Sequence, residues 1–338
     1  MSAPGRAQAF ISLRSTRRAR AGRGRRASPS RGAALLMAMV ILTLVATLAA
    51  AMVWQQWRAL QVETAERARA QATWILTGSL DFGRVMLRLD GRTPGVDHLG
   101  EPWATELQES SLSGLLAVDR DRSADSDLEV YLSGRIQDAQ ARYNLRNLVD
   151  AKYRLVPAEV AALTRLCESA GLAPEVAQTI AEGLRAAWAA RVGAVGTDAP
   201  LAPRSVAQLT WLGLDAADVA ALEPLVVLLP QPTPLNLNTA SAQVLVGALA
   251  GLDSASAQQL VQARQAQPLR SIDDARAAVP GVDAFDARRT SVGSNYFEVT
   301  GRLRARDRVV EERMLVHRAG RVVTSLWRER HAVAPRGS

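Results

Sequence analysis

Hydrophobic residues are distributed unevenly along the chain, and their densest run lies near the N-terminus. Residues 33–57 contain no charged side chain and are largely apolar as far as Trp54. As a helix, residues 33–54 would be about 33 Å long, which matches the roughly 30 Å hydrocarbon core of a bilayer. Apolar positions then recur at steps of three or four residues without a proline, so the spacing predicts one long helix to about Arg88.

Alternating apolar and polar positions predict strands in two separate parts of the remaining chain. The expected strands cover residues 112–118, 128–136, 296–303, 309–317 and 321–327. Between the two groups the chain is rich in alanine and predicts short helices over residues 157–170, 174–192, 205–212, 216–227, 254–265 and 271–279. This order predicts an α+β fold: a long N-terminal helix plus an antiparallel sheet, with a large all-α domain inserted between strands. The two ends of such an insert should lie close together.

The positive charge of the chain is concentrated at one end. The formal net charge is +8, but residues 1–31 hold nine of the 41 basic residues and no acidic residue. The remaining 32 basic residues face 33 acidic ones, so the body is nearly neutral. An excess of arginine before an apolar helix predicts a cytoplasmic N-terminus and a body on the other side of the membrane. A nearly neutral body disfavours nucleic-acid binding.

Three interpretations of the N-terminal segment compete. A secretory signal peptide would be cut before Met52, after the small residues 49–51. A permanent anchor would keep the whole segment. A pilin-type leader would be cut after a glycine at the membrane face, as Gly32 before Ala33 allows. The helical pattern that continues beyond the apolar run favours the third interpretation, because a signal peptide predicts no such continuation.

Few residues suggest chemistry. A single cysteine, Cys167, excludes an intramolecular disulfide, and its alanine- and leucine-rich surroundings predict a buried, unreactive thiol. His98 lies near two acids but predicts no metal site, because the three histidines are far apart in the sequence. Four aspartates between residues 119 and 127 offer oxygen ligands of the kind calcium prefers, although a solvated turn is the simpler interpretation. The usual motifs of hydrolases and phosphate-binding enzymes are missing from the sequence, so we expect no enzymatic activity.

Residues 234–281 are similar to helix-hairpin-helix repeats, in which hairpin amides contact DNA phosphates. The hairpin usually requires a second glycine at the position where this chain has Asp253. A carboxylate there would repel phosphate, so a structural helical module is expected. A membrane-anchored DNA-uptake protein remains the alternative function.

Several short motifs, taken in order, resemble general secretion pathway protein K, the minor pseudopilin family of type II secretion systems. The resemblance covers nearly the whole chain. It rests on Arg31-Gly32 before the apolar run and on residues 97–104, 134–138, 142–148, 234–240 and 294–299. It implies a pilin-like head carrying a helical insert, at the tip of a periplasmic pseudopilus that the protein initiates or caps during export across the outer membrane.

The resemblance also implies processing and partners. A prepilin peptidase would cut between Gly32 and Ala33 and methylate the new amine. The fifth residue of the mature chain, usually glutamate in pilin-like proteins, would be Met37. Expected partners are minor pseudopilins I and J, the major pseudopilin, the peptidase and the inner-membrane secretion platform, with no nucleic acid. Because family members can bind calcium in the head, calcium is a candidate ligand; the candidate side chains are Asp119, Asp121, Asp125 and Asp127.

These expectations divide the chain into seven parts. We expect the protein to cross the bacterial inner membrane once, with its N-terminus in the cytoplasm and its body in the periplasm. The parts are a basic prepilin leader (1–32), a transmembrane and filament-core helix (33–57), a first part of the head (58–142), a first helical module (143–233), a second helical module (234–290), the C-terminal strands of the head (291–330) and a tail (331–338).

Overall fold

A computed structural model describes residues 31–92, 95–112, 130–191, 193, 199–305 and 308–333. The chain divides into two compact units, one ending at Arg67 and the other beginning at Ala68. A single helix, α1 (Arg31–Asp90), runs from the first unit into the second. The predicted long helix is therefore confirmed, and neither Gly78 nor Gly83 interrupts it.

The described part of the first unit consists of α1 residues alone. Side chains from residue 32 to residue 67 are all exposed. The helix is long and apolar enough to cross a membrane, judged by length and composition. Trp54 and Trp57 pack against each other near the end of the apolar run, with ring centroids 5.4 Å apart.

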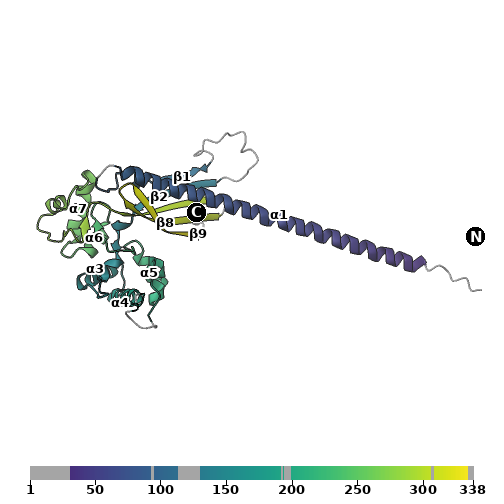
Figure 1. The fold of residues 1–338 in the computed structure, drawn as a ribbon, viewed down its shortest axis with the longest axis horizontal. Helices are drawn as coiled ribbons and strands as arrows, with labels where there is room; N and C mark the ends of the chain where they lie inside the picture. The colour runs from purple at the N-terminus through teal and green to yellow at the C-terminus, as the bar shows by residue number, and fades with distance from the viewer. Residues whose placement is uncertain are drawn as a thin grey trace, which may run out of the picture. The chain divides into compact units, whose positions relative to one another are not determined.

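In the second unit, residues 68–90 of α1 pack on a five-stranded sheet. Leu76, Leu80 and Leu87 are at most 1% exposed, and their spacing places them on one face of the helix. Leu80 and Leu87 share a hydrophobic cluster with strand residues such as Val299 and Met314, and Leu76 belongs to a second cluster with Leu132 and Leu303. Figure 1 shows this part of α1 along the sheet, with helices α3 to α7 gathered beyond one end of the strands.

The sheet is antiparallel throughout and has the strand order β1-β2-β7-β8-β9. Its second and third strands are neighbours in space but are separated in sequence by the helical insert. The predicted fold class, an α+β fold with an all-α domain inserted between strands, is confirmed. The strands are β1 (Leu107–Ser111), β2 (Val130–Asp138), β7 (Tyr296–Ala305), β8 (Arg308–Ala319) and β9 (Val322–Val333).

The insert forms one hydrophobic core from two groups of helices. The close contact between the groups involves Gly247 and Leu166, where a Cβ on the glycine would lie 2.4 Å from a leucine methyl carbon. The first group contains η2 (Ala139–Ala141), η3 (Leu145–Leu148), α3 (Pro157–Ser169), α4 (Pro174–Ala190), η4 (Val206–Leu212) and α5 (Ala216–Leu222). The second contains α6 (Ala242–Ala248), α7 (Ser254–Ala266) and α8 (Ile272–Ala278).

One local prediction was wrong. The helix expected over 216–227 ends at Leu222, and Pro224, two residues further on, has no backbone N–H with which to continue the helical hydrogen bonds. Residues Val226–Val227 instead form β4, which pairs in parallel with β3 (Tyr143–Asn144). The short helix expected over 205–212 is confirmed and is a 3-10 helix, Val206–Leu212. Most of the strand expected over 112–118 lies outside the described residues.

A glycine allows α1 to approach the sheet closely. A Cβ on Gly83 would lie 2.5 Å from Val299 Cγ1 in β7, a distance too short for two carbon atoms. A Cβ on Gly78, five residues earlier in the same helix, would meet no atom within 4 Å. The two glycines therefore form a matched pair for testing the packing of α1.

Gly83→Ala should lower the free energy of unfolding by roughly 1–3 kcal/mol, because the added methyl group overpacks the helix–sheet contact. Gly78→Ala should instead raise it by up to about 1 kcal/mol, since alanine is the better helix former. Urea unfolding of the chain in non-ionic detergent, followed by near-UV circular dichroism, measures both. Equal effects of the two substitutions would contradict the close approach.

Candidate functional site

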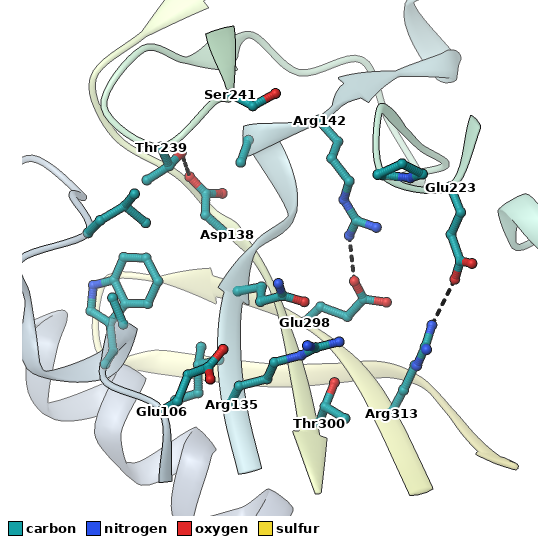
Figure 2. Close-up of a pocket in the computed structure, with 17 residues that line it drawn as sticks. Glu106, Arg135, Asp138, Arg142, Glu223, Thr239, Ser241, Glu298, Thr300 and Arg313 are labelled. Atoms are coloured by element: carbon teal, nitrogen blue, oxygen red, sulfur yellow. Dashed lines mark hydrogen bonds and ion pairs between the residues drawn. The ribbon is translucent and has the colours of Figure 1, made fainter. Parts of the chain in front are cut away.

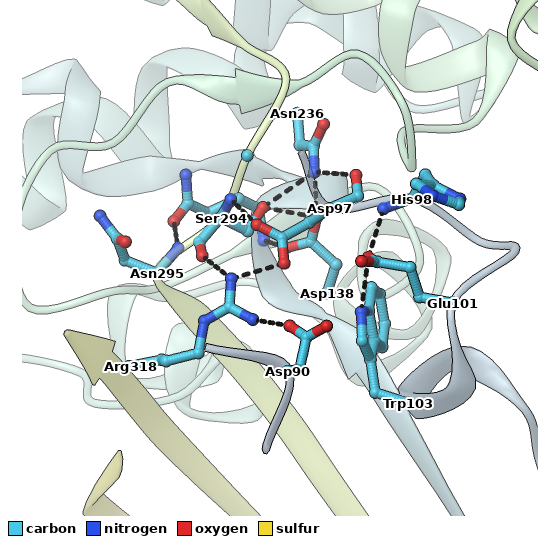
Figure 3. Close-up of polar contacts among 12 residues, drawn as sticks. Asp90, Asp97, His98, Glu101, Trp103, Asp138, Asn236, Ser294, Asn295 and Arg318 are labelled. Carbon is cyan, nitrogen blue, oxygen red and sulfur yellow. Dashed lines mark hydrogen bonds and ion pairs between the residues drawn. The ribbon is translucent and has the colours of Figure 1, made fainter. Parts of the chain in front are cut away.

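A buried carboxylate joins the sheet to the insert (Figure 3). Asp138 ends β2, and its Oδ1 accepts a hydrogen bond from the backbone N–H of Gln140 at 2.8 Å. Its Oδ2 accepts three more, from Asn236 Nδ2 at 2.9 Å, Thr239 Oγ1 at 2.6 Å and Ser294 Oγ at 2.6 Å. Burial raises the pKa of this carboxyl group, and the three side-chain donors oppose that effect. The insert is thus anchored by buried hydrogen bonds, and these polar groups need no water molecule as a partner.

A second carboxylate extends the network toward the end of α1. Asp97 is 4% exposed and accepts a hydrogen bond from Ser294 N at 2.7 Å. Arg318 of β8 forms ion pairs with both Asp97 and Asp90, and its guanidinium lies over the Phe297 ring, 4.5 Å from the centroid. Figure 3 shows the guanidinium between the two carboxylates. These contacts tie the last turn of α1 to β8 and to the end of the insert.

The loop after α1 is held by its own side chains. Glu101 Oε2 accepts hydrogen bonds from the backbone N–H of His98 at 2.9 Å and from Trp103 Nε1 at 2.8 Å. Trp103 is 2% exposed and packs edge-on against Phe297, with ring centroids 5.2 Å apart. His98 Nδ1 accepts a hydrogen bond from Gly100 N at 3.1 Å. The role of His98 is therefore local and structural.

Three carboxylates meet at this loop. Oxygen atoms of Asp90, Asp97 and Glu101 lie within 4.8 Å of one another. Burial raises the pKa of both Asp90 and Asp97, while Arg318 acts in the opposite direction. The guanidinium already supplies a positive charge to two of the three groups, so their arrangement is explained without a metal ion. The four aspartates predicted as calcium candidates, Asp119, Asp121, Asp125 and Asp127, lie outside the described residues.

Two asparagines at the start of the insert hold the segment that connects its two helical groups. Asn144 Nδ2 donates to Gln231 O at 2.8 Å, and its Oδ1 accepts from Leu229 N at 3.2 Å. Asn147 exchanges two hydrogen bonds with the backbone of Thr233, at 3.0 and 3.1 Å. Both asparagines come from the motif at 142–148, so this motif encodes how the first helical group holds the segment that leads to the second.

The hairpin between α6 and α7 is closed by a carboxylate. Gly251 takes a positive φ of 84°, and Asp253 caps α7 by accepting a hydrogen bond from Ser256 N at 2.7 Å. Those backbone hydrogen bonds lower the pKa of Asp253. Arg264 is 8% exposed and donates to Leu237 O, inside the fold. The Ser256 amide and the Arg264 guanidinium are two groups that could contact phosphate, but both already form hydrogen bonds within the fold. This arrangement disfavours DNA binding.

The N-terminal positions singled out in the sequence lie in the first turns of α1. Gly32, Ala33 and Met37 are exposed there. Cys167 is fully buried in α3, and burial raises the pKa of its thiol to about 11. This environment agrees with an unreactive cysteine.

A second apolar stripe on α1 was missed by the sequence analysis. Trp74, Phe82, Val85 and Leu89 are 77%, 63%, 43% and 45% exposed, and they belong to the part of α1 that packs on the sheet. Their spacing of eight, three and four residues places them on one side of the helix, with Gly78 between the first two. We call these four residues the outer stripe. The signal was present, but the spacing that predicted the buried face of α1 left the apolar residues on the other side of the helix unassigned.

A groove lies between the sheet and the insert, on the side of β2, β7 and β8 that faces away from α1 (Figure 2). Its volume is about 520 Å³. Charged side chains pair across it: Arg142 with Glu298, and Arg313 with Glu223 at 2.9 Å. Because these charges neutralise one another, the groove holds the insert against the sheet and offers little net charge to a ligand.

Comparisons with known proteins agree with this architecture. Two family models described as type II secretion system protein K match residues 141–231 and 235–295. A type II secretion system protein K of Pseudomonas aeruginosa is 29% identical, over 82% of this chain and 85% of its own length. Another from Klebsiella pneumoniae is 30% identical, over 72% of this chain and 77% of its own. The chain belongs to the type II secretion system protein K family.

A solved structure supports the fold. The crystal structure of the GspK-GspI-GspJ complex from enterotoxigenic Escherichia coli contains a chain that matches with a TM-score of 0.56 and 20% identity. The match covers 79% of this chain and 98% of that one. The resemblance to protein K stated from the motifs is confirmed, and so is membership of the pseudopilins of a protein secretion system.

Asp138→Ala should destabilise this protein K family member by at least about 3 kcal/mol. The substitution leaves three buried donors, on Gln140, Thr239 and Ser294, without their acceptor. Each such donor costs about 1–3 kcal/mol, whereas Asn236 Nδ2 still donates to Asp97 O. Asp273→Ala provides the control, because Asp273 is paired with Arg276 but its side chain is 82% exposed; its effect should stay within about 0.5 kcal/mol. Urea unfolding measures both values. An effect of Asp138→Ala no larger than that of the control would show that the network is dispensable.

Proposed function

We propose that this chain is a minor pseudopilin that occupies the tip of a periplasmic pseudopilus and initiates or caps that fibre during export across the outer membrane. The observation that supports this proposal is the position of the insert. It leaves the sheet at Asp138 and returns at Ser294, and the hydrogen bond between these residues holds its two ends together. Arg318, which donates to Ser294 O and pairs with Asp90, links these ends to the last turn of α1. A bulky domain at that end of the head would limit addition of a further subunit beyond it.

The N-terminal part of α1 supports a single membrane crossing. Residues 33–57 would span the inner membrane and later lie in the filament core, with the arginine-rich residues 1–31 in the cytoplasm. Trp54 and Trp57 mark the end of the apolar run, where aromatic side chains favour the membrane–water interface. The body would then be periplasmic.

Processing would occur at the start of this helix. Cleavage between Gly32 and Ala33 by the prepilin peptidase, followed by methylation of the Ala33 amine, would leave Met37 as the fifth residue. A carboxylate at that position would need a partner to offset the cost of its burial. A methionine needs none, which suits a subunit that has no neighbour on one side.

The outer stripe suggests where partner subunits bind. The structure of the Escherichia coli relative contains GspI and GspJ beside GspK. We propose that the corresponding minor pseudopilins I and J bind this chain along the outer stripe of α1. The large exposed apolar side chains of the stripe are of the kind that packs between neighbouring helices. The major pseudopilin and the inner-membrane secretion platform would be further partners.

Trp74→Glu combined with Phe82→Glu should reduce co-purification of minor pseudopilins I and J roughly tenfold or more, because charges would enter an apolar contact. The matched control is Leu201→Glu, a residue of the insert that is 73% exposed. Affinity purification from membranes with quantitative immunoblotting gives the readout. Equal recovery with both variants would place the partners elsewhere.

Removing the insert tests the tip position. A variant lacking residues 143–290, joined by a short glycine–serine linker, should produce longer or more numerous pseudopili in electron micrographs. It should also carry Asp138→Ala, so that no buried carboxylate is left without Asn236 and Thr239. The full chain with Asp138→Ala is the control for that substitution. Unchanged filament length and number, with I and J still bound, would rule out the capping role.

A further inference from the structure

A second groove lies between the insert and the end of the sheet formed by β8 and β9. Its volume is about 660 Å³, within the roughly 300–1,000 Å³ typical of ligand sites. Arg146, Arg191 and Arg204 line it, and among the described lining residues there is no carboxylate. The nearly neutral body of the chain makes this local excess of positive charge notable. We call this site the arginine groove.

Aromatic and apolar side chains form the floor of the arginine groove. Trp188, Trp327 and Tyr153 line it together with leucines from both the insert and the sheet. Arg146 is held in place, because its guanidinium lies over the Trp188 ring, 4.4 Å from the centroid, and donates to a backbone oxygen, Val149 O, at 3.1 Å. The groove therefore combines prepositioned cations with surfaces for apolar side chains.

A β-bulge in β9 determines which side chains form one wall of the arginine groove. Leu315 pairs with Trp327 and Val316 pairs with Ser325, so Leu326 is an extra residue in β9. In a regular strand Leu326 and Trp327 would point to opposite faces, yet both line the groove. Bulges are frequent beside functional sites, where they redirect side chains.

One further feature of the arginine groove is unexplained by the fold alone. Trp327 Nε1 is buried, and the described part of the chain provides no acceptor for its hydrogen. A buried donor without an acceptor is costly, and a ligand with an oxygen atom would satisfy it.

We propose that the arginine groove binds an extended acidic segment of a partner polypeptide. Arginine clusters recognise carboxylates by charge-assisted hydrogen bonds, and a backbone or side-chain oxygen of the segment would accept from Trp327 Nε1. The leucines favour a polypeptide over a nucleic acid, because they provide pockets for aliphatic side chains between the cations. This site is separate from the outer stripe and does not depend on the tip position of the subunit.

Fluorescence anisotropy with the full chain in non-ionic detergent tests the proposal. The probe is a short labelled peptide of glutamate, aspartate, proline and leucine, compared with the same peptide carrying glutamine and asparagine instead of the acids. The acidic peptide should bind roughly tenfold more tightly, and Trp327→Phe should weaken it several-fold by removing the indole donor. Equal binding of both peptides, or none of the acidic one, would overturn the proposal.

A charge-matched pair of variants separates the groove from general electrostatics. Arg191→Glu with Arg204→Glu changes two exposed groove residues and should lower affinity for the acidic peptide roughly tenfold or more. Arg270→Glu with Arg288→Glu makes the same change in charge at exposed positions elsewhere on the insert and should leave it unchanged. Equal losses in both variants would overturn the proposal, as would displacement of the peptide by single-stranded DNA or anionic lipid at lower concentration than by unlabelled peptide.

Discussion

The buried carboxylate of Asp138 is the contact on which the arrangement of head and insert depends. A carboxylate removed from water requires several donors, and here they come from the start of the insert, from its middle and from the segment that returns to the sheet. Each donor is useful only when all these segments are in place. The carboxylate therefore couples the position of the insert to the end of β2 and makes partial docking unfavourable.

Close approach of α1 to the sheet is the second constraint. Leucines spaced along one face of α1 cover the strands, and Gly83 removes the side chain that would separate helix from β7. Arg318 then closes the end of the helix by pairing with Asp90 and Asp97. The opposite face of the sheet is left for the insert, which contacts it through apolar residues and paired charges. The head thus carries a helix on one face of its sheet and the inserted domain beyond one end of the strands, where the insert also contacts the opposite face.

The two grooves differ in how their charges are balanced. In the groove of Figure 2, arginines pair with glutamates across the boundary between sheet and insert, and this pairing favours a structural role. In the arginine groove the described lining residues supply cations without carboxylates. The difference could not be read from the sequence, since arginines and glutamates are interspersed in both regions. It arises because residues distant in sequence are brought together only when the insert docks.

Local patterns in the sequence were sufficient for the helices and strands, because hydropathy and spacing act over a few residues. They determined the continuous α1, the three C-terminal strands, the helical insert and the family resemblance. They did not indicate β1, the early end of the helix before Pro224, or the outer stripe of α1. The tertiary structure alone decided the partners of the motif side chains. Asp138 and Ser294, for example, are 156 residues apart and meet at 2.6 Å. Such pairings form because buried polar groups need hydrogen-bond partners, and the folded chain supplies these partners from segments distant in sequence. No short-range sequence pattern indicates which residues will pair.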